Sequence, residues 1–169
     1  ASKENALLAE RCMTHQAACC KQGQLFLPAA EYERLLAWVQ ANAPDEAAEF
    51  IGRIAAYDGF YLYHQRTRCQ FLDPQNLCRL HHTGTKPSEC FWWPLHVYVN
   101  ANGQLDIRAA SYCCNAAEHL QPDADHVQTL IGQVQQLDPD LIRRYRAVYP
   151  GLAQDKRLLA EVPPVKKLR

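Results

Sequence analysis

The spacing of apolar residues predicts helices in the first and last thirds of the chain. Leu8, Cys12, His15 and Cys19 recur at intervals of four, three and four, which places them on one stripe of a helix over 7–20. Helical periodicity also runs through four further segments: 31–38, 45–56, 123–137 and 140–148. Pro28, Pro44 and Pro139 lie near expected helix starts.

The middle of the chain predicts a small antiparallel sheet. Residues 60–63 are aromatic and apolar, and 92–99 and 105–109 flank an Asn102-Gly103 pair that is typical of a hairpin turn. Between these strands, 68–94 holds three cysteines and three prolines with little periodicity, which indicates a structured loop. We therefore expect an α+β fold, with a small antiparallel sheet, flanking helices and a cysteine-rich metal-binding loop region. The expected organisation is a single domain over 1–162 and a tail over 163–169.

The composition fits a soluble globular protein. Hydrophobic residues make up 48% of the 169 residues and charged residues 21%, a balance that can fill a packed core. Eighteen basic and eighteen acidic side chains give zero formal net charge, so no overall field attracts nucleic acid or anionic lipid. No apolar run approaches the roughly 18 residues of a membrane span. We therefore expect neither nucleic acid nor a membrane as a partner.

The cysteines are the compositional feature that points to chemistry. A tetrahedral zinc ion or a cubane iron–sulfur cluster needs about four thiolates within a few ångströms, so eight thiols supply one set with a remainder, or two sets. We expect all eight to be metal ligands. They form an N-terminal group, a central group and a late pair: Cys12, Cys19 and Cys20; Cys69, Cys78 and Cys90; Cys113 and Cys114.

Local geometry limits which ligands can share an ion. Adjacent side chains in a regular helix or strand point in different directions, so Cys19 and Cys20 favour two sites, or a polynuclear one, unless the backbone bends there. In a helix, Cys12 and Cys19 would lie about 10.5 Å apart along the axis, which is far for one ion. His15 could share an ion with either cysteine. Residues 78–81, Cys-Arg-Leu-His, offer a second mixed pair.

Two other interpretations stay open at this point. Free cysteines are often buried as small hydrophobic residues, but eight with two vicinal pairs exceed what a core normally uses. An even count also fits a disulfide framework in a secreted chain, although such frameworks mostly serve chains that lack a core. The histidines are in turn compatible with ordinary exposed polar residues.

The central cysteines lie in a motif. Cys69-Gln70-Phe71-Leu72-Asp73 is followed by Cys78 and then by Lys86-Pro87-Ser88-Glu89-Cys90-Phe91-Trp92-Trp93-Pro94. This order resembles the YkgJ-like, CxxCxxCC-type zinc- or iron-chelating domain family, which has C-x-F-L, a later cysteine, R-P-x-x-C and an aromatic-Pro pair. Lys86 replaces the usual arginine. The N-terminal segment has one extra residue, and His15 stands where the family has a second cysteine.

The resemblance, which spans 12–94, implies a cytoplasmic bacterial protein that binds zinc or an iron–sulfur cluster. Similar cysteine arrangements are associated with iron–sulfur-dependent flagellin lysine methylases, but no catalytic residue carries over. We favour an iron–sulfur cluster over zinc, because eight thiolates exceed the needs of one structural zinc ion. The surroundings of the central set also suit an anionic cluster. Apolar bulk is expected from Phe71, Leu72, Phe91, Trp92 and Trp93, and positive charge from Arg66, Arg68, Arg79 and Lys86.

Three functions are compatible with such a site. Closed sites would suit an electron carrier or an accessory subunit of a protein partner, whereas an open coordination position would suit an iron–sulfur enzyme. A thiol-rich metal carrier or store is the third, although Met13 is the only methionine and a copper specialist usually has more. Glycine-rich nucleotide loops, zinc-protease motifs and nucleophile elbows do not occur in the sequence.

Overall fold

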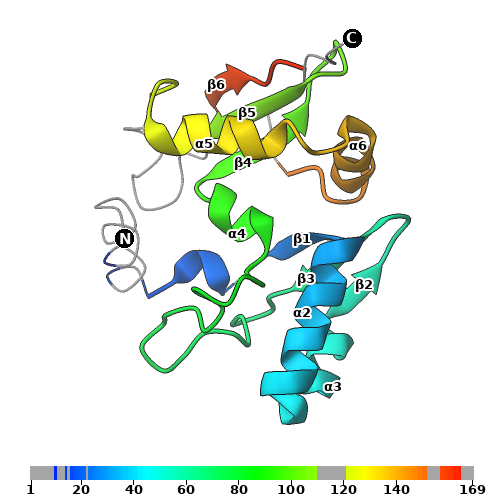
Figure 1. Cartoon of the computed structure of the whole chain (residues 1–169), viewed down its shortest axis with the longest axis vertical. Helices are drawn as coiled ribbons and strands as arrows, with labels where there is room; N and C mark the ends of the chain where they lie inside the picture. Colours follow the sequence, from blue (N-terminus) through cyan, green and yellow to red (C-terminus); the bar gives the residue numbers. More distant parts are fainter. Residues whose placement is uncertain are drawn as a thin grey trace. The chain divides into compact units, whose positions relative to one another are not determined.

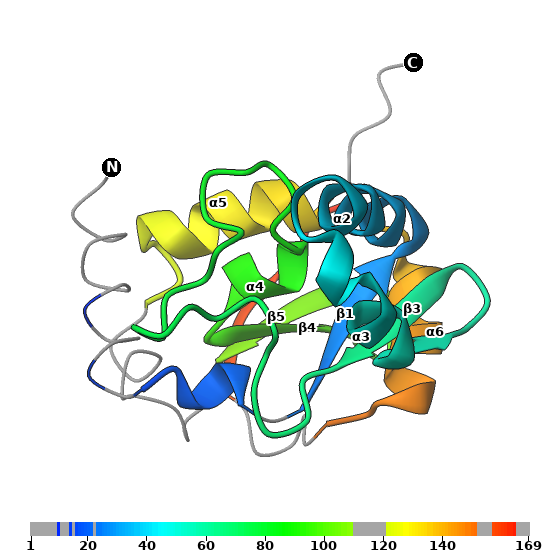
Figure 2. The same cartoon turned by 90° about the horizontal axis from the view of Figure 1, so that it is seen from below.

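The computed structural model describes residues 10, 14, 16–21, 23–109, 121–151 and 157–164 (Figures 1 and 2). The chain divides into two compact units, Ala1–Phe91 and Trp92–Arg169, and each is described by itself. The expectation of one domain over 1–162 stays a prediction.

A three-stranded antiparallel sheet forms the base of the first unit. Its strands, in the spatial order β1-β3-β2, are β1 (Gln24–Pro28), β3 (Phe60–His64) and β2 (Ile54–Ala56). Leu25 pairs with Tyr63, and Leu27 pairs with Tyr61. Because side chains alternate along a strand, these four residues project from the same face of the sheet.

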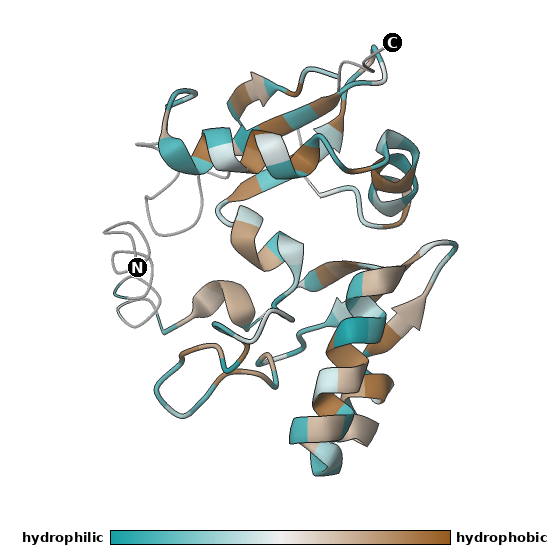
Figure 3. Ribbon diagram, in the orientation of Figure 1, coloured by the Kyte–Doolittle hydropathy of each residue, from teal (hydrophilic) through white to brown (hydrophobic). Residues whose placement is uncertain are grey.

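Two helices pack on that face, α2 (Ala29–Asn42) and α3 (Ala47–Gly52). The 3₁₀ helix η2 (Pro44–Glu46) joins them. The fixed φ of Pro28 leads the chain directly from β1 into α2, and Pro44 occupies the first position of η2, where its missing N–H leaves no bond unmade. α2 packs against β1 and β3, and its banded colouring in Figure 3 shows hydrophilic and hydrophobic residues in alternation.

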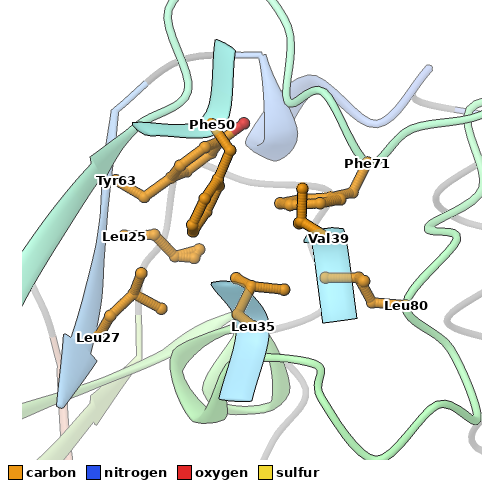
Figure 4. Close-up of a cluster of buried hydrophobic side chains, with 8 residues drawn as sticks. All are labelled: Leu25, Leu27, Leu35, Val39, Phe50, Tyr63, Phe71 and Leu80. Carbon is orange, nitrogen blue, oxygen red and sulfur yellow. The ribbon is translucent and has the colours of Figure 1, made fainter. Parts of the chain in front are cut away.

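The core of this unit is a cluster of eight buried side chains that point toward one another (Figure 4). The Phe50 ring stacks on the Tyr63 ring at 5.8 Å between centroids, and Phe71 lies 5.9 Å from each of these two rings. We call this set the apolar cluster; it consists of Leu25, Leu27, Leu35, Val39, Phe50, Tyr63, Phe71 and Leu80.

The second unit has its own antiparallel sheet, in the order β4-β5-β6. Its elements are β4 (Leu95–Val99), β5 (Leu105–Ala109), α5 (Asp125–Val134), α6 (Pro139–Val148) and β6 (Arg157–Glu161). The β4–β5 turn contains Gly103 at a φ of 78°, which a glycine adopts without strain. α5 lies along one face of the sheet (Figures 1 and 2), and α6 packs against β4. The Asp138 side chain caps α6 by accepting the Asp140 N–H.

These observations confirm the α+β fold, the hairpin at 102–103 and helices within four of the periodic segments. Two boundaries were wrong. Residues 54–56 form β2 and do not continue the helix predicted over 45–56, and Trp92 ends the short helix α4 (Ser88–Trp92) instead of beginning a strand. Of the helix predicted over 7–20, residues 7–9, 11–13 and 15 lie outside the described residues, and 16–20 form a turn and a short 3₁₀ helix instead of a regular α-helix.

Candidate metal centre

Five of the eight predicted ligands lie in the described part of the first unit. None of these five cysteines takes part in a disulfide, and each is half-buried: Cys19, Cys20, Cys69, Cys78 and Cys90. Cys12, Cys113, Cys114 and the alternative ligand His15 lie outside the described residues, so their part in a site stays a prediction.

Cys69 and Cys78 lie at the two ends of a short antiparallel turn. The Asp73 carboxylate accepts the backbone N–H of Leu77 at 2.9 Å, which holds the turn in the manner of an Asx motif. A backbone bridge between Leu72 and Cys78 closes the turn. The turn therefore places Cys78 beside Leu72, three residues after Cys69.

Cys90 is positioned by α4, which a carboxylate from α2 holds in place. Glu31 accepts both the backbone N–H of Ser88, at 2.9 Å, and the Ser88 hydroxyl. The backbone N–H of Phe26 donates in turn to the Glu89 carboxylate. These bonds fasten the two residues that precede Cys90 to α2 and β1, and the charged acceptors strengthen them.

The central thiols share an apolar wall. Cys69, Cys78 and Cys90 all pack against the apolar cluster. Phe71 is part of the cluster and Leu72 is 8% exposed, so the expected apolar surroundings are confirmed for these two residues. Phe91 is half exposed, so its expected contribution to these surroundings stays a prediction. Trp92 and Trp93 belong to the second unit and are not placed relative to the thiols.

The N-terminal cysteines join the central group through the backbone. The Cys69 N–H donates to the Cys20 carbonyl at 2.7 Å. Gln16 and Ala17 have φ values of 52° and 49°, so a regular helix does not run through to the 3₁₀ helix η1 (Ala18–Cys20). Within η1, the Cys19 and Cys20 sulfurs lie 3.9 Å apart.

That separation changes the expectation for the vicinal pair. Two thiolates on one tetrahedral zinc ion lie about 3.8 Å apart, from a Zn–S bond of about 2.3 Å. Cys19 and Cys20 are therefore close enough to bind the same ion. The expectation that adjacent side chains diverge holds only in a regular helix or strand.

Burial controls the ionisation of the central thiols. It raises the pKa of Cys69, and it raises the pKa of Cys90 well above the ordinary value. Negative charge on Cys78 raises both pKa values further, so the three thiols lie within electrostatic reach of one another. Lys86 lowers the pKa of Cys90 without reversing its shift. The metal-free thiols of Cys69 and Cys90 are therefore neutral, and a bound cation would favour their ionisation.

Two of the four expected basic residues act on the thiols. The pKa of Arg79 is raised chiefly by its hydrogen bond to Glu46, and also by the charges of Cys69 and Cys78. Lys86 influences Cys90, as described above. Arg68 donates instead to the Asp73 carbonyl at 2.5 Å, and Arg66 donates to the Gly52 carbonyl at 3.0 Å.

Arg53 is a site residue that sequence reasoning missed. Its side chain is only 10% exposed, and it donates to the carbonyls of Gln65 at 3.0 Å and Arg68 at 2.6 Å. It also lowers the pKa of Cys69. No local pattern could have found it, because Arg53 lies 16 positions before Cys69 and reaches it only through the pairing of β2 with β3.

A polar cavity of about 340 Å³ opens beside Cys69. Two acidic and two basic residues stand in its wall, and Arg53 pairs with Glu49 there. Its lining consists of Glu46, Glu49, Arg53, Arg68, Cys69, Gln70 and Leu72.

The donor chemistry of these residues fits a thiophilic metal, since thiolates are preferred ligands of zinc and of iron–sulfur clusters. Within the described ranges, however, no three or more Cys, His, Asp or Glu side chains gather closely enough to hold an ion. His81 lies near Lys86, with 3.4 Å between its Nδ1 and the Lys86 Nζ; burial lowers its pKa, with Lys86 contributing. The mixed site predicted for Cys78 and His81 stays a prediction.

Among the helices of the described residues, none has the length and apolar character needed to cross a membrane.

Comparison with known proteins agrees with this chemistry. Comparisons with curated proteins and with solved structures found no significant match. A family model described as "Putative zinc- or iron-chelating domain" matches residues 11–115, well over half of the chain. This match includes every cysteine discussed above, and the chain therefore belongs to the CxxCxxCC family of metal-chelating domains.

Proposed function

We propose that this protein holds an iron–sulfur cluster through its clustered thiolates and serves as an electron carrier or accessory subunit. The observation that carries the proposal is the common apolar wall behind Cys69, Cys78 and Cys90. Low solvent access and nearby apolar side chains stabilise and tune thiolate–metal centres. Zinc is the alternative cofactor for the same donors.

Charge favours the cluster over zinc. Arg53, Arg79 and Lys86 each interact electrostatically with at least one central thiol. A cubane cluster with four thiolates carries net negative charge. Lys86 offsets part of this charge, and the two arginines contribute to the offset although each is also paired with a glutamate. We propose all eight cysteines as ligands, in one site or two, with Cys12, Cys113 and Cys114 completing the donor set. A reducing cytoplasm would keep these thiols available.

Anaerobic purification with elemental analysis and absorbance from 300 to 600 nm tests the proposal. A cluster predicts broad absorption near about 400 nm and about four irons per chain, or about eight for two clusters. Stoichiometric zinc in a colourless protein would replace the cluster with the zinc alternative. A sample with neither metal that takes up neither zinc nor iron and sulfide under reducing conditions would refute both.

Variants localise the metal. Cys78→Ser should lower the metal content, because it removes a thiolate from the central set. Gln75→Ser is the matched control, since Gln75 is exposed in the same turn and is not a proposed ligand. Equal metal content in Cys78→Ser, Gln75→Ser and wild type would exclude Cys78 from the site.

The cavity beside Cys69 favours a second candidate function, an enzyme with an open coordination position. An external ligand could approach the metal from this side, whereas a closed electron carrier needs no such access. Anaerobic titration of the loaded protein with cyanide tests this alternative. A saturable change in the spectrum would support an open position, and an unchanged spectrum would favour the electron carrier.

A further inference from the structure

Tyr63 places one polar atom at the edge of the apolar cluster. Its ring is 2% exposed and stacks with Phe50, as a phenylalanine would. Figure 4 shows the hydroxyl oxygen at the far end of this ring. That oxygen lies 3.9 Å from the sulfur of Cys69, within hydrogen-bond reach for a sulfur acceptor.

The neighbours of the hydroxyl decide which way its proton points. The backbone N–H of Gln70 donates to the Tyr63 oxygen at 3.1 Å, and Arg53 Nη1 donates to it at 3.4 Å. A phenol oxygen that accepts two donors has its own O–H left to donate. The available acceptors are the Cys69 sulfur and the side-chain carbonyl of Gln70, at 3.5 Å.

A change in the charge of Cys69 would decide between these acceptors. A neutral thiol is a weak acceptor, whereas a metal-bound thiolate carries negative charge and accepts more strongly than a neutral amide. Arg53 is itself held in place, because it donates to the Gln65 and Arg68 carbonyls and pairs with Glu49. The donor group is therefore arranged before the metal arrives.

We propose that Tyr63 is a positioning residue for the metal. The Tyr63 hydroxyl donates a hydrogen bond to the metal-bound thiolate of Cys69, and Arg53 holds the hydroxyl in that orientation. This inference rests on the proposed function. A hydrogen bond to a ligating sulfur withdraws electron density from it, which raises the reduction potential of an iron–sulfur centre. The same effect raises the energy of the sulfur-to-metal charge-transfer absorption.

The test compares Tyr63→Phe with Tyr61→Phe in the full chain, loaded anaerobically with Co²⁺ and, separately, with iron and sulfide. Each variant loses one hydroxyl from β3, and Tyr61 projects from the same face as Tyr63. Tyr63→Phe should move the charge-transfer band to lower energy, lower the midpoint potential and weaken Co²⁺ binding about tenfold. Tyr61→Phe should match the wild type.

A second variant separates tuning of the sulfur from damage to the fold. Gln70→Ala keeps the backbone N–H that binds the Tyr63 oxygen but removes the competing carbonyl acceptor. Its band and its potential should move in the direction opposite to those of Tyr63→Phe. This variant also preserves the test if Tyr63→Phe folds poorly.

The outcomes separate this inference from the proposed function. Normal loading of the wild type with no shift in Tyr63→Phe, or shifts of the same sign in Tyr63→Phe and Gln70→Ala, would overturn the role of Tyr63 alone. If the wild type binds no Co²⁺ and also takes up no iron and sulfide, the proposed function is overturned, and the role of Tyr63 with it.

Discussion

Replacing Phe71 by alanine should cost several kcal/mol of stability, whereas the same change at Phe91 should cost little. Phe71 is 3% exposed and contacts the rings of Trp38, Phe50 and Tyr63. It also lies in the turn between two proposed ligands. Phe91 follows Cys90 directly but is 50% exposed, with Lys86 4.8 Å above its ring.

The magnitudes follow from burial. Truncating a fully buried phenylalanine removes its transfer free energy and leaves a cavity, which together cost about 3–5 kcal/mol. A half-exposed phenylalanine leaves no cavity, and its partial burial with one exposed cation–π contact is worth about 1 kcal/mol. The two variants should therefore differ by about 3 kcal/mol in the free energy of unfolding.

Urea unfolding of the reduced, metal-free proteins, followed by circular dichroism, measures this difference. Chelator competition with Co²⁺ then tests the link to the site, because a disordered turn should weaken metal binding in Phe71→Ala more than in Phe91→Ala. Equal losses of stability in the two variants, or a loss below about 1 kcal/mol for Phe71→Ala, would refute the assignment of Phe71 to the wall behind the thiols.

Three further predictions concern the metal, pH and the anchoring of Cys90. Removing the metal with a chelator should lower the melting temperature and weaken the near-UV dichroism through loss of order at 68–94, since metal binding is coupled to folding; unchanged signals would contradict this. Burial raises the pKa values of Cys69 and Cys90 in the folded metal-free protein. The unfolded chain therefore loses these thiol protons first, above a pKa of about 8.5, and the folded state loses stability as the pH rises through this range. Urea midpoints from pH 7.5 to 9.5 should therefore fall, and fall less in Cys90→Ala. Glu31→Ala should cost about 1–2 kcal/mol in urea unfolding and weaken Co²⁺ binding, because the Glu31 carboxylate on α2 holds Ser88 at the start of α4. Glu33→Ala should be neutral, since Glu33 is an exposed residue of α2.

Local sequence signals were sufficient where an element depends on local chemistry. The Asn102-Gly103 pair located the hairpin because its turn needs a positive φ at Gly103. β1 was missed because Leu25, Phe26 and Leu27 are all buried, so the strand shows no alternation of apolar and polar residues. Trp92 was misplaced because a short apolar run fits the end of a helix as well as the start of a strand.

The candidate site divides in the same way. The motif around Cys69, Cys78 and Cys90 identified three thiols that share one wall. Arg53 and Tyr63 could not be identified as neighbours of Cys69, because strand pairing and loop packing bring them there. The helix predicted over 7–20 does not continue to Cys19, because Ala17 has a positive φ, a conformation that alanine rarely adopts and that the sequence does not signal.

The hydrogen bond between Cys69 and Cys20 extends the pairing of β1 with β3. Gln24 pairs with His64, the Gln65 N–H then bonds the Gly23 carbonyl, and the Cys69 N–H bonds the Cys20 carbonyl. The register of β1 with β3 and the short turn at 65–69, and not the length of chain between the two strands, therefore fix the separation of these two cysteines. Extra residues near Ala43, between α2 and η2, would leave both cysteines where they are, whereas a single residue added at 66–68 would displace Cys69. Variation in chain length among proteins with this fold should accordingly collect at the first position and be excluded from the second.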